Sequence, residues 1–282
     1  MDDKETKNNE DYQIYPILKD PEEQEYIPIG DRLLKPPFVY ALIGTRMVGK
    51  TTLMMSLTMR EYPFYLGAFD RIILISPTLG VDTSTRELVN YIGEENTFDF
   101  YDDGIIDGII AHNKNLPKPM REKILVIGDD LPAMGIPMNA KIYTTLSCAG
   151  RHYGISTILI SQILRGNNIG LPPACRNNIE GYFIFRNSNQ KQLNNIFEEL
   201  GHFGSPANIE AMYNDVVGGK PYQFLYLNSR NLTAHRNLDD EIWSMYDENG
   251  NYNQEYNKMK KNKMLDNNIK DEPSRPTSPT VQ

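Results

Sequence analysis

A short apolar run that leads directly into a glycine-rich loop is the feature that most constrains this chain. Residues 38–43 read FVYALI, and GTRMVGKTT follows at 44–52. The spacing Gly-x4-Gly-Lys-Thr is the P-loop pattern, with an expected strand before it and an expected helix after it. Backbone N–H groups of such a loop and of the following helix start surround a phosphate. The pattern therefore predicts an α/β fold built around a phosphate site.

The loop and the first helical turn supply the expected nucleotide-binding residues. Lys50 is expected to reach the β and γ phosphates of ATP, and the Thr51 hydroxyl to ligate Mg²⁺. Arg46 either contacts a phosphate or faces solvent, and the second alternative is favoured. The interior of the loop is bulkier than usual. The predicted nucleotide-binding set is Gly44, Thr45, Arg46, Met47, Val48, Gly49, Lys50, Thr51 and Thr52.

Short apolar runs alternate with helix-like segments along the rest of the chain. Several runs are apolar at successive positions, which is typical of strands buried on both faces of a sheet. The alternation predicts a three-layer α/β domain with a mainly parallel central sheet. The expected strands are Phe38–Ile43, Arg71–Ser76, Lys123–Ile127, Ile155–Ser161, Gly181–Phe185 and Tyr222–Leu227. The expected helices are Lys50–Glu61, Thr83–Glu94, Asn139–Gly150, Gln190–Leu200 and Pro206–Val216.

Charge and composition set the expected domain boundaries. An acidic, flexible N-terminal segment is predicted at 1–31, the ATPase domain at 32–250, and a disordered polar tail at 251–282. Residues 1–37 hold ten acids against five bases, whereas residues 251–282 hold six bases against four acids. A Gly-Gly turn is expected to lead into the last strand. Trp243, in DDEIWSMY, is expected on an amphipathic helix that packs on the core.

The overall composition excludes some classes of protein. The two cysteines suit a reduced, intracellular protein without a disulfide framework. No apolar run reaches the ~18 residues of a membrane span, and the polar, acidic start does not resemble a signal peptide. The net charge of -8 argues against a surface that binds nucleic acid everywhere. It permits binding of nucleic acid by a few loops.

Two adjacent acids follow the third expected strand in KILVIGDDL. Carboxyl ends of parallel strands are where ligands collect in such folds. Asp129 is predicted to hold Mg²⁺, and Asp130 to polarise an attacking water. The alternative, in which the two acids exchange these roles, stays open because the register is uncertain by one residue.

The segment GRHYGISTILISQ places an arginine and a glutamine at opposite ends of one expected strand. Gln162 is expected near the γ-phosphate, where its amide can orient water or sense the phosphate. Arg151 lies one strand length away, roughly 20 Å, so it is poorly placed for its own subunit's nucleotide. It is predicted to complete a neighbouring subunit's site in trans. Arg176 and Arg186 are the alternative trans arginines.

These motifs, taken in order, resemble the FtsK/HerA group of DNA-pumping ATPases. The similarity is greatest to the genome-packaging ATPases of poxviruses, giant DNA viruses and virophages. It rests on Leu34-Lys35-Pro36-Pro37-Phe38 before the first strand, the Asp-Asp pair, and Gly-Arg-His before the sensor strand. The resemblance covers roughly residues 32–200. The appended DNA-reading domain that some of these motors carry has no counterpart in it.

The resemblance implies a RecA-like (ASCE) P-loop NTPase that uses ATP and Mg²⁺. It implies a homo-oligomeric ring that drives double-stranded DNA into a viral capsid, docked at a portal-type vertex. The expected location is the host cytoplasm or a viral factory, with association with the virion as an alternative. Two other functions remain open: a small-molecule or nucleoside kinase, and a non-motor, capsid-associated nucleotide-binding protein.

Overall fold

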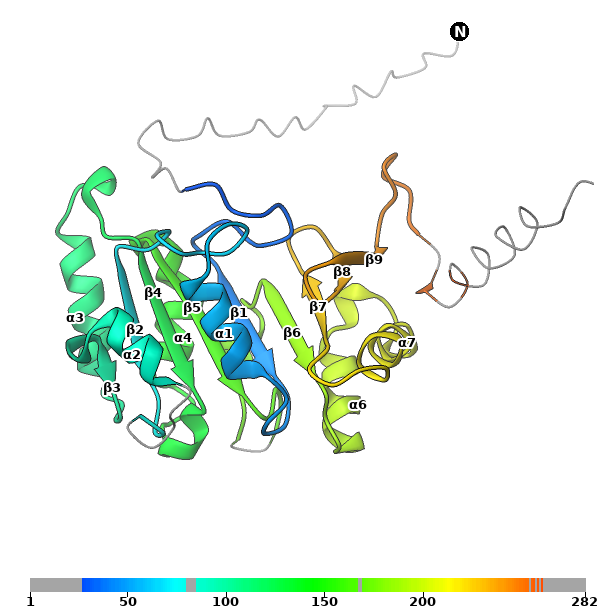
Figure 1. Ribbon diagram of the computed structural model, residues 1–282, viewed down its shortest axis with the longest axis horizontal. Coiled ribbons are helices and arrows are strands. Elements are labelled where there is room, and N and C mark those ends of the chain that lie inside the picture. The colour runs from blue at the N-terminus through cyan, green and yellow to red at the C-terminus, as the bar shows by residue number, and fades with distance from the viewer. Residues whose placement is uncertain are drawn as a thin grey trace, which may run out of the picture.

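The computed structural model describes residues 27–79, 85–166, 169–253, 255, 256, 258 and 260. Within these residues the strands form one nine-stranded sheet in the order β3-β2-β4-β5-β1-β6-β7-β8-β9 (Figure 1). The strands are β1 Val39–Ile43, β2 Arg71–Ile75, β3 Thr97–Phe98, β4 Ile124–Asp129, β5 Ile155–Ser161, β6 Gly181–Phe185, β7 Phe224–Asn228, β8 Thr233–Arg236 and β9 Asp240–Ser244.

The sheet is parallel from β3 to β6 and antiparallel from β6 to β9. Each of the expected strands is present, and its ends match the prediction or differ from it by at most two residues. Residues of β1, β5 and β6 are buried throughout, as is typical of strands covered on both faces. The predicted α/β class with a mainly parallel sheet is therefore confirmed.

Helices cover both faces of this sheet. They are α1 Lys50–Met59, α2 Arg86–Ile92, α3 Asp103–Lys114, α4 Lys141–Ala149, α5 Pro173–Arg176, α6 Gln190–Glu199 and α7 Pro206–Val217. In Figure 1, α1 and α2 lie in front of the sheet, whereas α4 lies behind it. Within the described residues, no helix combines the length and the apolar character that a membrane crossing requires.

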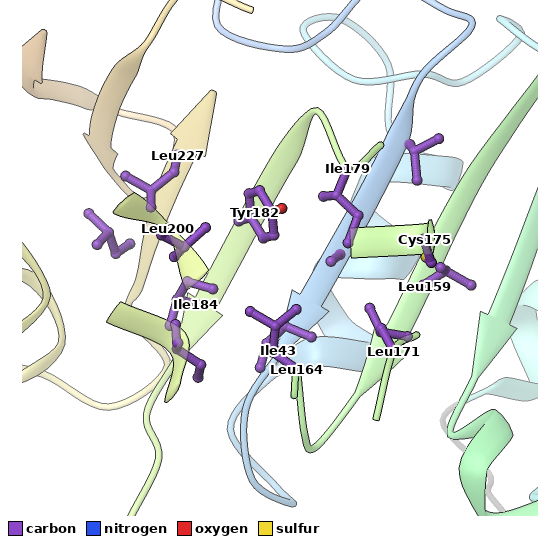
Figure 2. Close-up of a cluster of buried hydrophobic side chains, with 14 of the residues drawn as sticks. Ile43, Leu159, Leu164, Leu171, Cys175, Ile179, Tyr182, Ile184, Leu200 and Leu227 are labelled. Atoms are coloured by element: carbon purple, nitrogen blue, oxygen red, sulfur yellow. The ribbon is translucent and has the colours of Figure 1, made fainter. Parts of the chain in front are cut away.

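Two apolar cores result, one on each face. Side chains of β1 alternate between them, because successive residues of a strand point to opposite faces. Tyr40 and Leu42 pack with α1 and α2, whereas Val39, Ala41 and Ile43 pack with the helices of the other face. Figure 2 shows part of the second core, where side chains of β1, β5, β6 and β7 meet those of α5 and the end of α6.

The segment before β1 is held by a buried tyrosine pair. The Tyr65 hydroxyl donates to the Leu34 carbonyl at 2.7 Å, and the Leu34 N–H donates to the Tyr40 hydroxyl at 2.7 Å. The two hydroxyls lie 2.9 Å apart. Leu34 and Phe38 are both buried. The Leu-Lys-Pro-Pro-Phe run thus anchors the chain where it enters the central strand.

The C-terminal third differs from its prediction. Trp243 is buried as expected, but it lies on β9 and not on a helix. Eight residues span too few turns for apolar spacing to separate a helix from a strand. The Gly-Gly turn leads into β7 as expected, yet β7 is followed by β8 and β9. The predicted last strand is therefore the first strand of an antiparallel extension.

The chain stays packed beyond residue 250. Tyr256 is buried, and its hydroxyl donates to Asp215 Oδ2 at 2.7 Å. Asp215 also accepts from Arg236 at 2.8 Å and from the Lys260 ammonium. Tyr256 and Lys260, described residues of the predicted polar tail, therefore contact the domain. The remainder of that tail, and residues 1–26 of the predicted acidic segment, lie outside the described residues.

Candidate nucleotide site at the carboxyl edge of the sheet

The predicted site residues of the P-loop, the acidic pair and the sensor strand all lie at one edge of the sheet. Parallel pairing puts Ile43 opposite Ser161, and Asp129 opposite Ile160. The residues that follow β1 and β5 therefore emerge beside the end of β4. Because carboxyl ends of parallel strands share an edge, the strand order alone brings these three motifs together.

The start of the P-loop is fixed to the strands on both of its sides. The Gly44 N–H donates to the Ser161 carbonyl at 3.2 Å, and the Thr45 N–H donates to the Arg186 carbonyl at 3.3 Å. A Cβ on Gly44 would lie 2.6 Å from the Cβ of Phe185, so a side chain does not fit there. Gly44 is therefore required by the close approach of β6.

The middle of the loop turns outward. Met47 has φ 61° and is 94% exposed, and Gly49 has φ 102°, a conformation that glycine adopts readily. Helix α1 begins directly afterwards at Lys50. Arg46 and Met47 are thus exposed, whereas Val48 is half-buried and packs on the core that contains α1.

Lys50 lies among the backbone and acidic groups of the site. Its ammonium donates to the carbonyls of Gly44 and Thr45, at 2.7 and 2.6 Å. Burial lowers the pKa of Lys50, and the carboxylates of Asp129 and Asp130 oppose that shift. The Lys50 side chain is therefore held by the start of the loop, within electrostatic range of the acidic pair.

The two acids have different backbone conformations. Asp129 is the last residue of β4, whereas Asp130 has φ 45°, in the left-handed region. Aspartate is among the non-glycine residues that tolerate this region best. The strand therefore ends at Asp129, and the chain turns at Asp130.

Each acid has its own side-chain partner. Ser76, directly after β2, donates its hydroxyl to Asp129 Oδ2 at 3.2 Å. Gln162, directly after β5, donates its amide to Asp130 Oδ2 at 3.3 Å. Ser76 was not predicted as a site residue. The sequence did offer one signal, because Ser76 lies at the carboxyl end of an expected strand. In a parallel sheet, that end lies at the same edge as the site.

The oxygens around Lys50 suit Mg²⁺. Mg²⁺ prefers carboxylate, hydroxyl and phosphate oxygens, and usually keeps several of its waters. The Asp129 carboxylate, positioned by Ser76, and the Thr51 hydroxyl in the first turn of α1 provide such oxygens. The donor set thus fits the metal that was expected from the sequence.

Arg151 lies at the opposite edge. It belongs to the short 3₁₀ turn Gly150–Tyr153, which immediately precedes β5. It is exposed, and its guanidinium has no hydrogen bond or ion pair with another described residue. It lines a cavity of about 310 Å³ at the amino ends of β1, β5 and β6. The seven residues of β5 separate it from Gln162, which is about 23 Å at ~3.3 Å per residue.

The two alternative arginines are placed differently. The Arg176 side chain is 11% exposed. Its guanidinium donates to Glu199 at 2.7 Å and to the Leu171 carbonyl at 2.6 Å. Arg186 follows β6, and its carbonyl holds Thr45 of the same chain's P-loop. Arg176 is thus engaged in internal packing, and Arg186 lies beside its own site. Neither arginine therefore resembles Arg151, whose guanidinium has no described partner and lies at the edge opposite the P-loop.

Comparison with known proteins places these motifs in a family. The sequence model described as Poxvirus A32 protein matches residues 29–214. Uncharacterized protein 075L of invertebrate iridescent virus 6 is 29% identical over 133 residues, 46% of this chain and 50% of that protein. The match therefore spans about half the length of that curated relative.

Solved structures share the fold at low sequence identity. B204, the DNA-packaging ATPase from Sulfolobus turreted icosahedral virus, has a TM-score of 0.50 at 17% identity. That match covers 72% of this chain and 98% of B204. B204 from Sulfolobus turreted icosahedral virus 2, in complex with ATP-gammaS, has a TM-score of 0.48 at 18% identity, over 72% of this chain and 98% of that one.

The family match extends over about two thirds of the 282 residues. It contains the P-loop, the acidic pair and the sensor strand, which are the motifs on which the resemblance in sequence rests. The expected family is therefore confirmed, and this chain belongs to the poxvirus A32 protein family.

Proposed function

We propose that this chain is the ATP-hydrolysing subunit of a motor that moves double-stranded DNA into a viral capsid. Membership of the poxvirus A32 protein family and a P-loop ATPase fold support this function. The observation that carries the hydrolytic part is the contact between Gln162 and Asp130 beside the P-loop. It joins a carboxylate and an amide, the two groups that can activate and orient a water molecule.

The P-loop binds the phosphates of ATP. Backbone N–H groups of residues 44–52 surround them, and the Lys50 ammonium neutralises charge on the β and γ phosphates. Thr51 and Asp129 hold Mg²⁺, which neutralises charge on the same phosphates when it is bound. The hydrogen bond from Ser76 restrains the Asp129 carboxylate, which supports this role.

Asp130 and Gln162 act on the attacking water. Asp130 accepts the proton of the water as the new bond to the γ-phosphorus forms and the bond from that phosphorus to the β,γ-bridging oxygen breaks, so that ADP leaves. Gln162 orients the water and responds to loss of the γ-phosphate. The Asp130 carboxylate accepts from Gln162, whereas the Asp129 carboxylate accepts from Ser76. The two acids can then serve the water and the metal separately.

Arg151 completes the site of a neighbouring subunit. A guanidinium stabilises charge that spreads over the transferred phosphoryl group. Arg151 lies a full strand length from its own P-loop and is not engaged by other described residues. This role makes the working unit a homo-oligomeric ring that docks at a vertex of the capsid. Packaging then takes place in the host cytoplasm or in a viral factory.

Release of inorganic phosphate from ATP, measured with and without double-stranded DNA, tests this function. We expect turnover that DNA stimulates severalfold and that shows little sequence preference, because a translocating motor contacts backbone phosphates. Transfer of the phosphate to an added nucleoside instead of water would identify a kinase. Absence of turnover in assembled rings would identify a non-motor nucleotide-binding protein. Either result contradicts the proposal.

A further inference from the structure

An exposed tyrosine lies beside the P-loop and is not used by the chemistry described above. Tyr222 is 70% exposed, and it precedes β7 in the loop that follows α7. Its ring carbon Cδ1 lies 3.5 Å from the point where a Cβ on Gly49 would be. The family match ends at residue 214, so this loop lies beyond the residues that it covers.

The antiparallel pairing of β7 explains why Tyr222 reaches this edge. Phe224, the first residue of β7, is paired with Phe185, the last residue of β6. The beginning of β7 is therefore at the same edge of the sheet as the end of β6 and the P-loop. Phe185 itself is buried, and its ring also lies near Gly49, with Cε1 3.7 Å from the same point. Tyr222 extends this aromatic surface into solvent.

The backbone of Tyr222 is strained. Its φ of 64° lies in the left-handed region, which a bulky residue rarely adopts. Gly218 and Gly219 precede it in the same loop, so a glycine at this turn would have been a simple solution. Retention of an exposed aromatic residue at a strained position beside a binding loop favours a role in ligand contact.

The order of groups along the edge indicates which part of a ligand Tyr222 meets. The acidic pair and Gln162 follow β4 and β5, on one side of β1, whereas Tyr222 precedes β7, beyond β6 on the other side. Asp129, the proposed Mg²⁺ residue, ends β4 on the first side, so a terminal phosphate bound together with the metal faces that side. A nucleotide is a linear arrangement of phosphates, ribose and base. Its base must therefore leave the P-loop on the side of β6 and β7.

We propose that the ring of Tyr222 is the platform on which the nucleoside part of the nucleotide stacks. Stacking on an aromatic ring suits every base, because every base has a π face. The platform therefore strengthens nucleotide binding without selecting strongly between adenine and guanine. This inference rests on the proposed nucleotide site and adds the element that distinguishes a nucleotide from inorganic phosphates.

Binding of ADP and of inorganic pyrophosphate, measured by calorimetry on the full chain, tests the platform. The two ligands share a diphosphate and differ by the nucleoside, and neither is hydrolysed at a γ-phosphate. Tyr222→Asn removes the ring, and asparagine fits the left-handed backbone better than tyrosine does. We expect the Kd for ADP to rise roughly tenfold and that for pyrophosphate to stay within about twofold. Tyr222→Phe should bind both ligands like the wild type.

A matched control and a direct reporter complete the test. Tyr91→Ala removes an exposed tyrosine from α2 and should change neither Kd. In the Tyr222→Trp variant, the tryptophan fluorescence should decrease in intensity or change its emission maximum when ADP is added, and should stay unchanged when pyrophosphate is added. The chain's single natural tryptophan, Trp243, is only 2% exposed and contributes a constant background to the fluorescence.

The possible failures are distinguishable. A Tyr222→Asn variant that binds ADP as tightly as the wild type, or that loses both ligands in parallel, overturns the platform and leaves the nucleotide site intact. A wild-type chain that binds neither ADP nor pyrophosphate overturns the nucleotide site and the platform together. Loss of both ligands in Lys50→Ala is the reference for that second outcome.

Discussion

Gln162 and Asp130 come from neighbouring strands and are joined by a hydrogen bond of 3.3 Å between the amide and a carboxylate oxygen. The backbone reinforces this contact, because the Asp130 N–H donates to the Ile160 carbonyl at 3.0 Å. The residue predicted to activate water and the residue predicted to sense phosphate therefore form one unit. A substitution at either residue should therefore alter the position of the other side chain.

Asp130→Asn separates binding from chemistry. Asparagine keeps an oxygen that accepts from Gln162, but it cannot take a proton from water. We expect the Kd for Mg²⁺–ATP to change by less than about threefold and phosphate release to fall roughly 10²- to 10⁴-fold. Asp129→Asn is the matched variant and should instead weaken Mg²⁺-dependent binding. The opposite pattern in the two variants would mean that the two acids have exchanged roles.

Lys50→Ala should abolish hydrolysis while the fold survives. The variant removes the cation between the loop and the acidic pair, and we expect phosphate release to fall by about 10²-fold or more. Lys191→Ala, which removes an exposed lysine from α6, is the control and should leave turnover unchanged. Circular dichroism checks the fold of both. A Lys50→Ala chain with more than about half of the wild-type turnover would refute the P-loop assignment.

Mixing two inactive variants tests whether Arg151 acts in trans. Arg151→Ala should fold, bind ATP and assemble, yet hydrolyse poorly, since only the transition state requires the guanidinium. Combined with Lys50→Ala chains, it should regain part of the wild-type turnover, because some interfaces pair an intact P-loop with an intact Arg151. Mixed rings of demonstrated composition that show no gain would exclude the trans role.

Arg176→Ala provides the contrast. The Arg176 guanidinium is held internally by Glu199 and the Leu171 carbonyl. We therefore expect this variant to lose stability in chemical denaturation, by roughly 1–3 kcal/mol. Because its P-loop and Arg151 are intact, the folded Arg176→Ala variant should keep phosphate release. Loss of turnover in folded Arg176→Ala chains that Lys50→Ala chains restore would move the trans role to Arg176.

Stability should depend on pH through His235. This side chain is 3% exposed, lies 2.9 Å from the Thr233 hydroxyl, and burial lowers its pKa to about 4. Between pH of about 6.5 and 4, the unfolded chain binds a proton that the folded chain does not. The free energy of unfolding should therefore fall as pH decreases through that window. Urea titrations at both ends should show a smaller fall for His235→Gln, and an equal fall would contradict the assignment.

The sequence predicted the parallel part of the sheet well, because its strands are short apolar runs buried on both faces. It did not predict α3, whose segment DGIIDGIIAHNK contains two glycines that disfavour a helix in isolation. Packing compensates, since Ile106 and Ile109 are buried in the core. For β9, tertiary pairing with β8 decided between two conformations that the local apolar spacing allowed equally.

At the site, sequence order was enough to bring together the residues that follow strands β1, β4 and β5. Ser76 and Tyr222 were missed for different reasons. Ser76 closed an expected strand and carried no motif of its own. Tyr222 was placed inside a strand, whereas it lies in a left-handed turn before β7. The surrounding fold determines the positive φ of this tyrosine, and no local residue pattern predicts it.

The separation of Arg151 from the P-loop by the full length of β5 has a consequence for assembly. If Arg151 acts in trans as proposed, each chain presents an arginine at one edge and a site at the other, so copies would join head to tail. An open row of such copies always contains one site without an arginine, whereas a closed ring contains none. Ring closure itself would then complete the last active site, so the first full round of hydrolysis would report that the ring has closed.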